Sequence, residues 1–429
     1  MEQDLLQKER QVSLMTKLEA QCAAAKRSAY ILSTVDTSKK NMVLEAIAEA
    51  LTKQQERWLM ANEKDLDAAR DGGMGSSLLD RLTLTPERIA GVVDSLRQVS
   101  ALPDPIGEVD RMETRPNGLI IGRRRVPLGV VAMVYEARPN VTVDAAALCL
   151  KSGNACVLRG GSEAIHSNRT AVEIMREVLV GAGLPEDSIS LVQDTDRETV
   201  NELMHLDQYI DVLIPRGGAG LIRAVAKNSS VPVIRTGEGV CHVYIDREAD
   251  LEMGAAILEN AKCSRPSVCN AVECVVIHRE AAEEFLSKAV PLLDKHNVEL
   301  RCDSEALAIL GCRGVPADDS DWDTEYGDYT LAVKIVGSVR EAIEFIDAHS
   351  TGHSESIITN NNFTAQHFLD AVDAAAVYVN ASTRFTDGGE FGLGAEIGIS
   401  TQKMHARGPL GLEELTSSKY VVYGQGQVR

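Results

Sequence analysis

The cysteine at position 269 stands where a thiol could act as a nucleophile. It follows Arg265-Pro266-Ser267-Val268, whose proline favours a loop, and it precedes the strand-like run Glu273–Ile277. A thiol at such a junction can point into a cleft while nearby backbone amides bind an oxyanion. An adjacent cation such as Arg265 would also lower the pKa of the thiol. We therefore expect Cys269 to be a nucleophile, with an inert, half-buried thiol as the alternative that this pattern leaves open.

Two glycine-rich loops could bind the phosphates of a nucleotide cofactor. Each follows a strand-like run and opens a helix, where glycine lets the backbone approach a phosphate and the helix N-terminus favours negative charge. The candidate cofactor-binding residues are Arg159, Gly160, Gly161, Ser162, Gly217 and Gly218. A cation at Arg159 suits the extra 2′-phosphate of NADP, so we expect NADP(H) rather than NAD(H). The alternative for both loops is an ordinary strand-to-helix turn.

Arg138 and Asn140 follow another strand-like run, which ends at Tyr135. Asn140 could donate to an oxyanion, and Arg138 and Arg265 are candidates for the phosphate and the carboxylate of a substrate. The alternative is a capped turn in which Asn140 caps the next helix, and the local pattern alone favours it. Which arginine meets which anion stays open.

Alternating strands and helices position these residues. The first hundred residues show helical spacing, with Thr85-Pro86-Glu87 as a helix start. From residue 126 the alternation predicts a parallel, doubly wound sheet, and after Gly239 it restarts as a second α/β domain. The expected strands are 128–135, 155–158, 188–192, 211–214, 231–234, 243–246 and 273–277.

Three further segments carry expectations of their own. The arginine-rich segment 107–125 could form a hairpin arm, and the strand-like run 419–423 could join an intersubunit sheet. The acidic segment 301–328 is expected to be an irregular surface excursion. The glycine-dense segment 388–396 predicts a loop, either close to a ligand or flexible on the surface.

Composition excludes some classes of partner. The net charge is −19, which argues against nucleic acid or an anionic membrane, and an anionic substrate would need local arginines. Nine cysteines at irregular spacing fit reduced thiols rather than a disulfide framework or a zinc site. We assign no residue to a metal. The polar N-terminus and the absence of a long apolar run favour a cytoplasmic enzyme.

Taken together, four segments resemble the gamma-glutamyl phosphate reductases, a family of the aldehyde dehydrogenase superfamily. They are Pro127–Val131, Tyr135–Thr142, Leu158–Ala164 and Arg265–Ala271. The resemblance extends from the N-terminal helices to the glycine-rich loop near residue 394, which is essentially the whole chain.

This resemblance implies an aldehyde-dehydrogenase-like α/β fold, with two doubly wound parallel-sheet domains and a small oligomerisation arm. Cys269 falls at the position of the family's nucleophile, and Glu325 falls where aldehyde dehydrogenases hold the nicotinamide ribose. The expected division is an NADP(H)-binding domain over 1–106 and 126–239, a catalytic domain over 240–405, and an oligomerisation element over 107–125 and 406–429.

The activity implied by the resemblance is the NADPH-dependent reduction of L-glutamyl 5-phosphate to L-glutamate 5-semialdehyde in proline biosynthesis. Phosphate would be released and a cysteine thioester would form. The expected state is a homo-oligomer, and glutamate 5-kinase, which would supply the acyl phosphate, is the partner that this activity suggests.

One departure from the superfamily pattern bears on this activity. Hydrolytic aldehyde dehydrogenases use a glutamate after the last strand of the cofactor domain to activate water, whereas Arg235 occupies the matching position here and Glu238 is displaced. Two alternatives remain: a hydrolytic aldehyde dehydrogenase that ignores phosphate, and a non-catalytic dinucleotide-binding or assembly protein.

Overall fold

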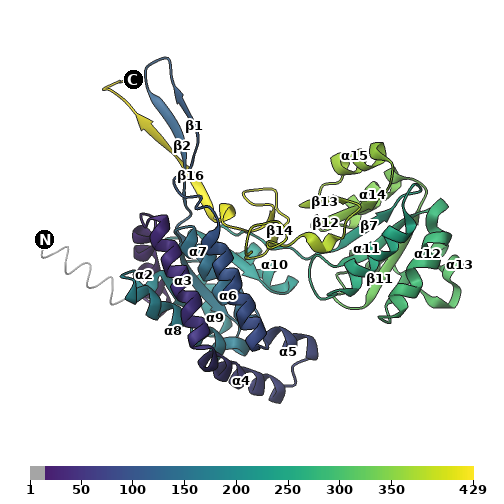
Figure 1. Ribbon diagram of the computed structural model, residues 1–429, viewed down its shortest axis with the longest axis horizontal. Helices are drawn as coiled ribbons and strands as arrows, with labels where there is room; N and C mark the ends of the chain where they lie inside the picture. Colours follow the sequence, from purple (N-terminus) through teal and green to yellow (C-terminus); the bar gives the residue numbers. More distant parts are fainter. Residues whose placement is uncertain (1–14) are drawn as a thin grey trace, which may run out of the picture. The chain divides into compact units, whose positions relative to one another are not determined.

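A computed structural model describes residues 15–429 of the chain, which divide into two compact units (Figure 1). Unit 1 comprises the chain up to Arg235 together with residues 392–398 and 410–429. Unit 2 comprises residues 236–391 and 399–409. The chain therefore passes from one unit to the other between Arg235 and Thr236 and then returns twice.

The first part of unit 1 is helical, and side-chain caps fix where several of its helices begin. Thr16 and Glu19 form a capping box at the start of α2, and Thr85 caps α6 with Pro86 at its first position, as the sequence predicts. These helices are α2 (Lys17–Leu32), α3 (Thr37–Lys53), α4 (Gln55–Asp71), α5 (Ser76–Leu82) and α6 (Pro86–Ala101).

The core of unit 1 is a parallel four-stranded sheet in the order β5-β4-β3-β6. Its strands are β3 (Val130–Tyr135), β4 (Ala155–Gly160), β5 (Ile189–Leu191) and β6 (Val212–Arg216). The connecting helices are η1 (Ser162–Ala164), η2 (Glu186–Ser188), α7 (Pro139–Lys151), α8 (Ile165–Gly181), α9 (Arg197–Leu203) and α10 (Ala219–Asn228). Every residue of β3 and β4 is buried, which is typical of a parallel sheet covered on both faces.

One predicted strand of this unit is wrong. Residues 231–234 form no strand in the described chain, and only Val233 makes an isolated parallel bridge, to Leu213. Pro232 lies in the middle of this run and cannot donate to a ladder, so the apolar pattern of the run does not extend the sheet.

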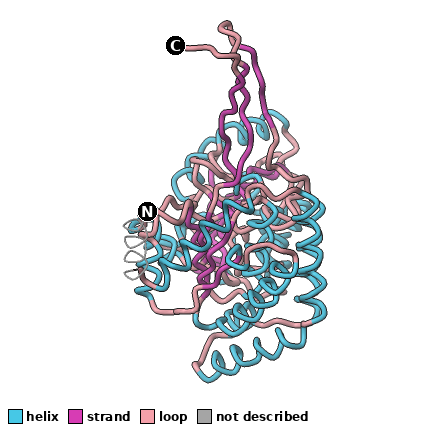
Figure 2. The backbone as a smooth tube through the Cα atoms, turned by 90° about the vertical axis from the view of Figure 1, so that its left-hand side faces the viewer, coloured by secondary structure: helices cyan, strands magenta, loops and turns pink. Residues whose placement is uncertain are grey.

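The predicted arm is present in unit 1 as a three-stranded antiparallel sheet. β1 (Val109–Thr114) and β2 (Ile120–Pro127) form a hairpin, and β16 (Thr416–Tyr423) pairs with the other edge of β2. Figure 2 shows these three strands extending away from the helices. Most of their side chains are exposed.

Unit 2 is built on a parallel seven-stranded sheet in the order β10-β9-β11-β8-β7-β12-β13. The strands are β7 (Cys241–Ile245), β8 (Val272–His278), β9 (Glu299–Cys302), β10 (Gly314–Pro316), β11 (Thr330–Val336), β12 (Ser354–Ile358) and β13 (Ala376–Val379). The helices are α11 (Leu251–Cys263), α12 (Arg279–Asp294), α13 (Ser304–Leu310), α14 (Val339–His349) and α15 (Asn362–Ala371), with the short η3 (Gly311–Arg313), η4 (Asp319–Asp323) and η5 (Thr383–Phe385). A two-stranded ladder joins β14 (Ile399–Ser400) to β15 (Gly408–Pro409), and η6 (Glu413–Leu415) precedes β16 in unit 1.

The segment 301–328 is more regular than its composition predicts. It contains α13 and β10, and β10 is the edge strand of the seven-stranded sheet. Short edge strands tolerate polar flanks and proline, so the acidic composition concealed this one. Among the residues that the structure describes, no helix is long and apolar enough to cross a membrane.

Candidate active site

Three loops meet at the carboxyl edge of the sheet of unit 1. Tyr135 ends β3 and lies opposite Gly160 of β4 on one side and Arg216 of β6 on the other. The loops that begin after these residues therefore lie side by side. In this strand order the chain reverses direction across the sheet between β3 and β6, which is where open α/β sheets bind ligands.

The loop after β4 contains the first group of predicted cofactor residues. Arg159 is buried, and its guanidinium donates to the carbonyls of Thr195, Asp196 and Gly160 while its Nε has no hydrogen-bond partner. Burial lowers the pKa of Arg159, and the nearby acids, Glu163 first, oppose that effect. Ser162 opens the short helix that leads into α8.

Two carboxylates, which the sequence did not single out, tie the three loops together. Glu163 Oε1 accepts from the backbone N–H of Ala137 at 2.6 Å, and Glu136 Oε2 accepts from the N–H of Gly218 at 3.0 Å. A Cβ on Gly217 would lie 2.6 Å from Glu136 Oε2, so a side chain at this position would displace that carboxylate. The amide of Gly218 is thus occupied by Glu136 in this structure.

The residues at this edge fit a dinucleotide in their chemistry. Arg159 supplies a cation with an unpartnered Nε. The Glu163 carboxylate lies against Gly161, where an added Cβ would be 2.1 Å from Oε1, so this backbone is close to a side chain that can move. Helices begin at the loops after β4 and β6, where backbone N–H groups favour anions.

Asn140 lies in the first turn of α7 and is not the cap of that helix. The helix begins at Pro139 with Arg138 as its cap residue, so the capped-turn alternative places Asn140 wrongly. Asn140 Nδ2 donates to Asp144 Oδ2, one helical turn further on, at 3.1 Å. This contact fixes the amide of Asn140 through an i, i+4 spacing that the sequence could have revealed.

Asp144 is the carboxylate that positions Asn140. Burial raises its pKa to about 6. Hydrogen bonds from Asn140 and Ser95 and the charge of Arg216 lower the pKa, but by less than burial raises it. Ser95 Oγ lies 3.4 Å from Asp144 Oδ1.

Cys269 lies in unit 2, in the loop between α11 and β8, where the sequence predicts it. It is half-buried, whereas seven of the nine cysteines, all of them within the described residues, are buried. Its carbonyl packs against Gly239, where a Cβ would lie 1.4 Å from the Cys269 oxygen, and it accepts from the Cys241 thiol at 3.2 Å. The backbone of Cys269 is therefore held from the side of β7.

The structure brings a second arginine to Cys269 that the sequence did not reveal. Arg384, in η5, donates through Nη1 to the side-chain oxygen of Asn270 and through Nε to Ser264 Oγ at 3.1 Å. Asn270 Nδ2 in turn donates to the carbonyls of Arg384 and Thr386 at 3.3 and 2.9 Å. Arg265, the predicted cation, is exposed.

Glu325 lies in a loop after η4, in the neighbourhood of the buried pair Lys262–Glu273. Lys262 Nζ lies 2.5 Å from Glu273 Oε2, and both side chains are almost wholly buried. Burial raises the pKa of Glu273 to about 7; Lys262 lowers it, and the charge of Glu325 adds a smaller upward effect.

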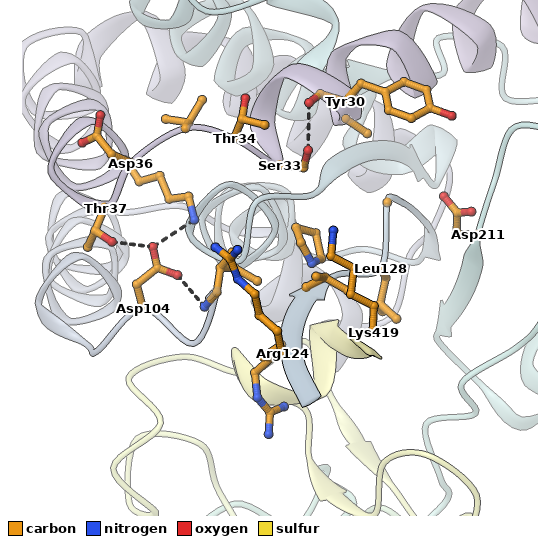
Figure 3. Close-up of a pocket in the computed structure, with 18 of the residues that line it drawn as sticks. Tyr30, Ser33, Thr34, Asp36, Thr37, Asp104, Arg124, Leu128, Asp211 and Lys419 are labelled. Atoms are coloured by element: carbon orange, nitrogen blue, oxygen red, sulfur yellow. Dashed lines mark hydrogen bonds and ion pairs between the residues drawn. The ribbon is translucent and has the colours of Figure 1, made fainter. Parts of the chain in front are cut away.

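A cavity of about 720 Å³ lies at the base of the arm in unit 1 and contains none of the predicted site residues (Figure 3). Two ion pairs line it, Lys40–Asp104 at 2.9 Å and Lys26–Asp211 at 2.6 Å. It is therefore distinct from the loops at the carboxyl edge of the sheet.

Comparison with known proteins decides the family. The family model described as the aldehyde dehydrogenase family matches residues 11–307. Gamma-glutamyl phosphate reductase of Enterococcus faecalis is 54% identical over 415 residues, covering 97% of this chain and 99% of that protein. The chain belongs to the gamma-glutamyl phosphate reductase family, within the aldehyde dehydrogenases.

Further gamma-glutamyl phosphate reductases agree with this placement. The one from Halothermothrix orenii is 55% identical, covering 95% of this chain and 98% of that protein. The crystal structure of the one from Thermotoga maritima superposes with a TM-score of 0.93 at 47% identity, covering 96% of this chain and 100% of that one.

More distant structures share the fold. An acetylating aldehyde dehydrogenase from Geobacillus thermoglucosidasius superposes with a TM-score of 0.71 at 17% identity, covering 96% of this chain and 97% of that one. The predicted family and the predicted fold class are thus confirmed.

Proposed function

We propose that this protein reduces L-glutamyl 5-phosphate to L-glutamate 5-semialdehyde with NADPH and releases inorganic phosphate, as a step of proline biosynthesis. The observation that carries this proposal is identity above 50% with gamma-glutamyl phosphate reductases over almost their whole length. A half-buried thiol at the position predicted for the nucleophile supports it.

Cys269 is the proposed nucleophile. Its thiolate attacks the acyl carbon of the substrate, the carbon–oxygen bond to phosphate breaks, and a thioester remains on the enzyme. Phosphate leaves readily as an anion, so the step needs cations near the acyl group more than it needs a general acid.

Hydride for the thioester carbon comes from NADPH when it is bound. We assign its 2′-phosphate to Arg159, its phosphates to the loop Gly160–Ser162 and to Gly217-Gly218, and its nicotinamide ribose to Glu325. The buried guanidinium of Arg159 and the glycine-lined loop after β4 support NADP(H). After hydride transfer, the Cys269 sulfur leaves as thiolate and the aldehyde is released.

Asn140 is the proposed donor to the oxyanion of each tetrahedral species, together with backbone amides near Cys269. One such donor typically contributes about 2.7–4 kcal/mol to the stabilisation of the transition state. Its hydrogen bond to Asp144 supports the role, because an amide fixed in advance does not have to reorganise during the reaction.

We further propose that residues 107–125 and 406–429 mediate association into a homo-oligomer, and that glutamate 5-kinase supplies the acyl phosphate. The exposed strands of the arm support the first point. Both β1 and β16 present a free edge, and Tyr420, Val422 and Tyr423 are exposed on β16.

The proposed reaction is tested in reverse, as NADP⁺ reduction by glutamate 5-semialdehyde with and without inorganic phosphate. The expected result is turnover that depends on phosphate and prefers NADP⁺ to NAD⁺. Cys269→Ala abolishes it, while Cys312→Ala, which removes an exposed thiol elsewhere, leaves it unchanged. Sustained turnover without phosphate would instead support a hydrolytic aldehyde dehydrogenase with Glu238 as the candidate water activator.

A further inference from the structure

Asn270, the residue that follows Cys269 in sequence, holds Arg384 close to Cys269. Asn270 receives a hydrogen bond from the Arg384 guanidinium and donates to the carbonyls of Arg384 and Thr386. Thr383 Oγ1 also donates to the carbonyl of Asn270 at 2.8 Å. These contacts join η5 to the Cys269 loop, although the two segments lie far apart in sequence.

The partners of this guanidinium leave its charge largely uncompensated. Its side-chain hydrogen bonds go to an amide oxygen and a hydroxyl, both of them neutral groups. Within unit 2, all of which the structure describes, no carboxylate forms an ion pair with Arg265 or Arg384. Burial and then the charge of Arg265 lower the pKa of Arg384, whereas Asp387 and Cys269 raise it. Two cations thus lie close together beside the thiol, in a chain of net charge −19.

We propose that Arg384 binds the phosphoryl group of the acyl phosphate, with Arg265 as the flanking cation. This inference rests on the proposed function and adds a substrate-binding residue to it. The phosphoryl group is attached to the carbon that Cys269 attacks, so it must lie within a few ångströms of the sulfur, whereas the substrate's α-carboxylate lies at the far end of its carbon chain. Arg384 is hydrogen-bonded to Asn270, the neighbour of Cys269, so its guanidinium lies at the end of the substrate that carries the phosphoryl group. A guanidinium binds phosphate through paired N–H donors.

In the reverse direction the same residue holds inorganic phosphate for attack on the thioester. A phosphate oxygen forms the new bond to the acyl carbon, the carbon–sulfur bond breaks, and its electron pair returns to Cys269 as thiolate. Arg384 stays protonated throughout, so its contribution is the binding and orientation of the anion.

The kinetic test compares Arg384→Gln with Arg384→Lys in the reverse assay. Loss of the cation is expected to raise the KM for phosphate at least tenfold, with a much smaller change in the KM for the aldehyde, and the lysine variant should recover part of the loss. Arg340→Gln is the matched control, because Arg340 is an exposed arginine of the same unit paired with Glu344. A rise confined to the KM for the aldehyde, or no change in either KM, would overturn the proposal.

A second test needs neither cofactor nor turnover. Alkylation of Cys269 is followed by peptide mass spectrometry with anionic iodoacetate and with neutral iodoacetamide, and exposed Cys312 serves as the internal reference. At Cys269, the alkylation rate with iodoacetate divided by the rate with iodoacetamide should be lower in Arg384→Gln than in the native protein. The same ratio at Cys312 should stay constant.

Inorganic phosphate should protect Cys269 in the native protein and fail to do so in Arg384→Gln. Equal protection in both proteins would overturn the proposal. Failure of the proposed function looks different, because the native protein would then show no phosphate-dependent turnover at all.

Discussion

At the residue scale, exposure separates Cys269 from the thiols around it. Burial raises the pKa of Cys241 and Cys274 well above the ordinary value and that of Cys263 to about 11, so these thiols stay protonated at neutral pH. Cys269 alone among the cysteines near the loop is half-buried. The local sequence predicted this residue because a loop and a strand on either side of it already imply a reachable thiol.

Gly239 determines where the Cys269 backbone can lie. Gly239→Ala should reduce kcat by at least a hundredfold, because the new Cβ would occupy the position of the Cys269 carbonyl and displace the nucleophile. The measurement is kcat in the reverse assay, with circular dichroism to confirm that the variant folds.

Gly91→Ala is the control for this substitution, since Gly91 lies in α6 with open space around it. It should leave kcat unchanged and stabilise the fold by about 0.5–1 kcal/mol. A Gly239→Ala enzyme with native kcat would contradict the account of the Cys269 loop.

Arg384 shows where single-residue reasoning stops. Nothing in Ser382-Thr383-Arg384-Phe385 marks a ligand site, and the fold alone brings this arginine to Asn270. The contact between Asn140 and Asp144 could have been predicted from the sequence, because the two residues are four positions apart on one helix.

At the element scale, Asp144 makes the stability contributed by α7 depend on pH. Burial raises the pKa of this carboxyl to about 6, from an ordinary value of 3.8. The folded state therefore keeps a proton that the unfolded state releases, so the contribution of this group to stability is complete below the unfolded pKa and is lost as pH rises through about 4 to 6. Relative to Asp144→Asn, the native protein should lose stability over this window.

This pH dependence is measured by urea unfolding of both proteins at a series of pH values. The Asp144→Asn variant keeps the shape of the side chain and lacks the titration, so the difference between the two free energies of unfolding isolates the carboxyl. A difference that does not vary with pH would contradict the burial of the charge.

A buried ion pair at the start of α3 lines the cavity at the base of the arm. Lys40 and Asp104 are 1% and 6% exposed. Thr37 also donates to Asp104, at 2.9 Å, as Figure 3 shows. Lys40→Met should lower the free energy of unfolding by about 3 kcal/mol, because it leaves Asp104 charged and buried without its partner. Lys53→Met is the control, since the exposed pair Lys53–Glu49 contributes about 0.5 kcal/mol or less. Equal effects in thermal unfolding would contradict the prediction.

At the scale of the whole molecule, the alternation of strand-like and helical runs predicted the sheet of unit 1 and two of the seven strands of unit 2, β7 and β8. Both parallel sheets and the arm were expected from the sequence, since buried parallel strands are continuous apolar runs that are readily recognised. The errors were at 231–234 and 301–328, where a proline-containing run resembled a strand and a short edge strand lacked an apolar pattern. Pairings between distant segments, such as β2 with β16 or η5 with the Cys269 loop, depend on tertiary packing that local pattern does not encode.

The central claim is that Cys269 carries a thioester which phosphate, and not water, resolves. Its most direct test is the mass of the intact protein after incubation with NADP⁺ and glutamate 5-semialdehyde in phosphate-free buffer. We predict a burst of about one NADPH per active site, a glutamyl adduct that maps to Cys269, and loss of the adduct when phosphate is added. An adduct on another cysteine, or continuous NADPH formation without phosphate, would contradict the account.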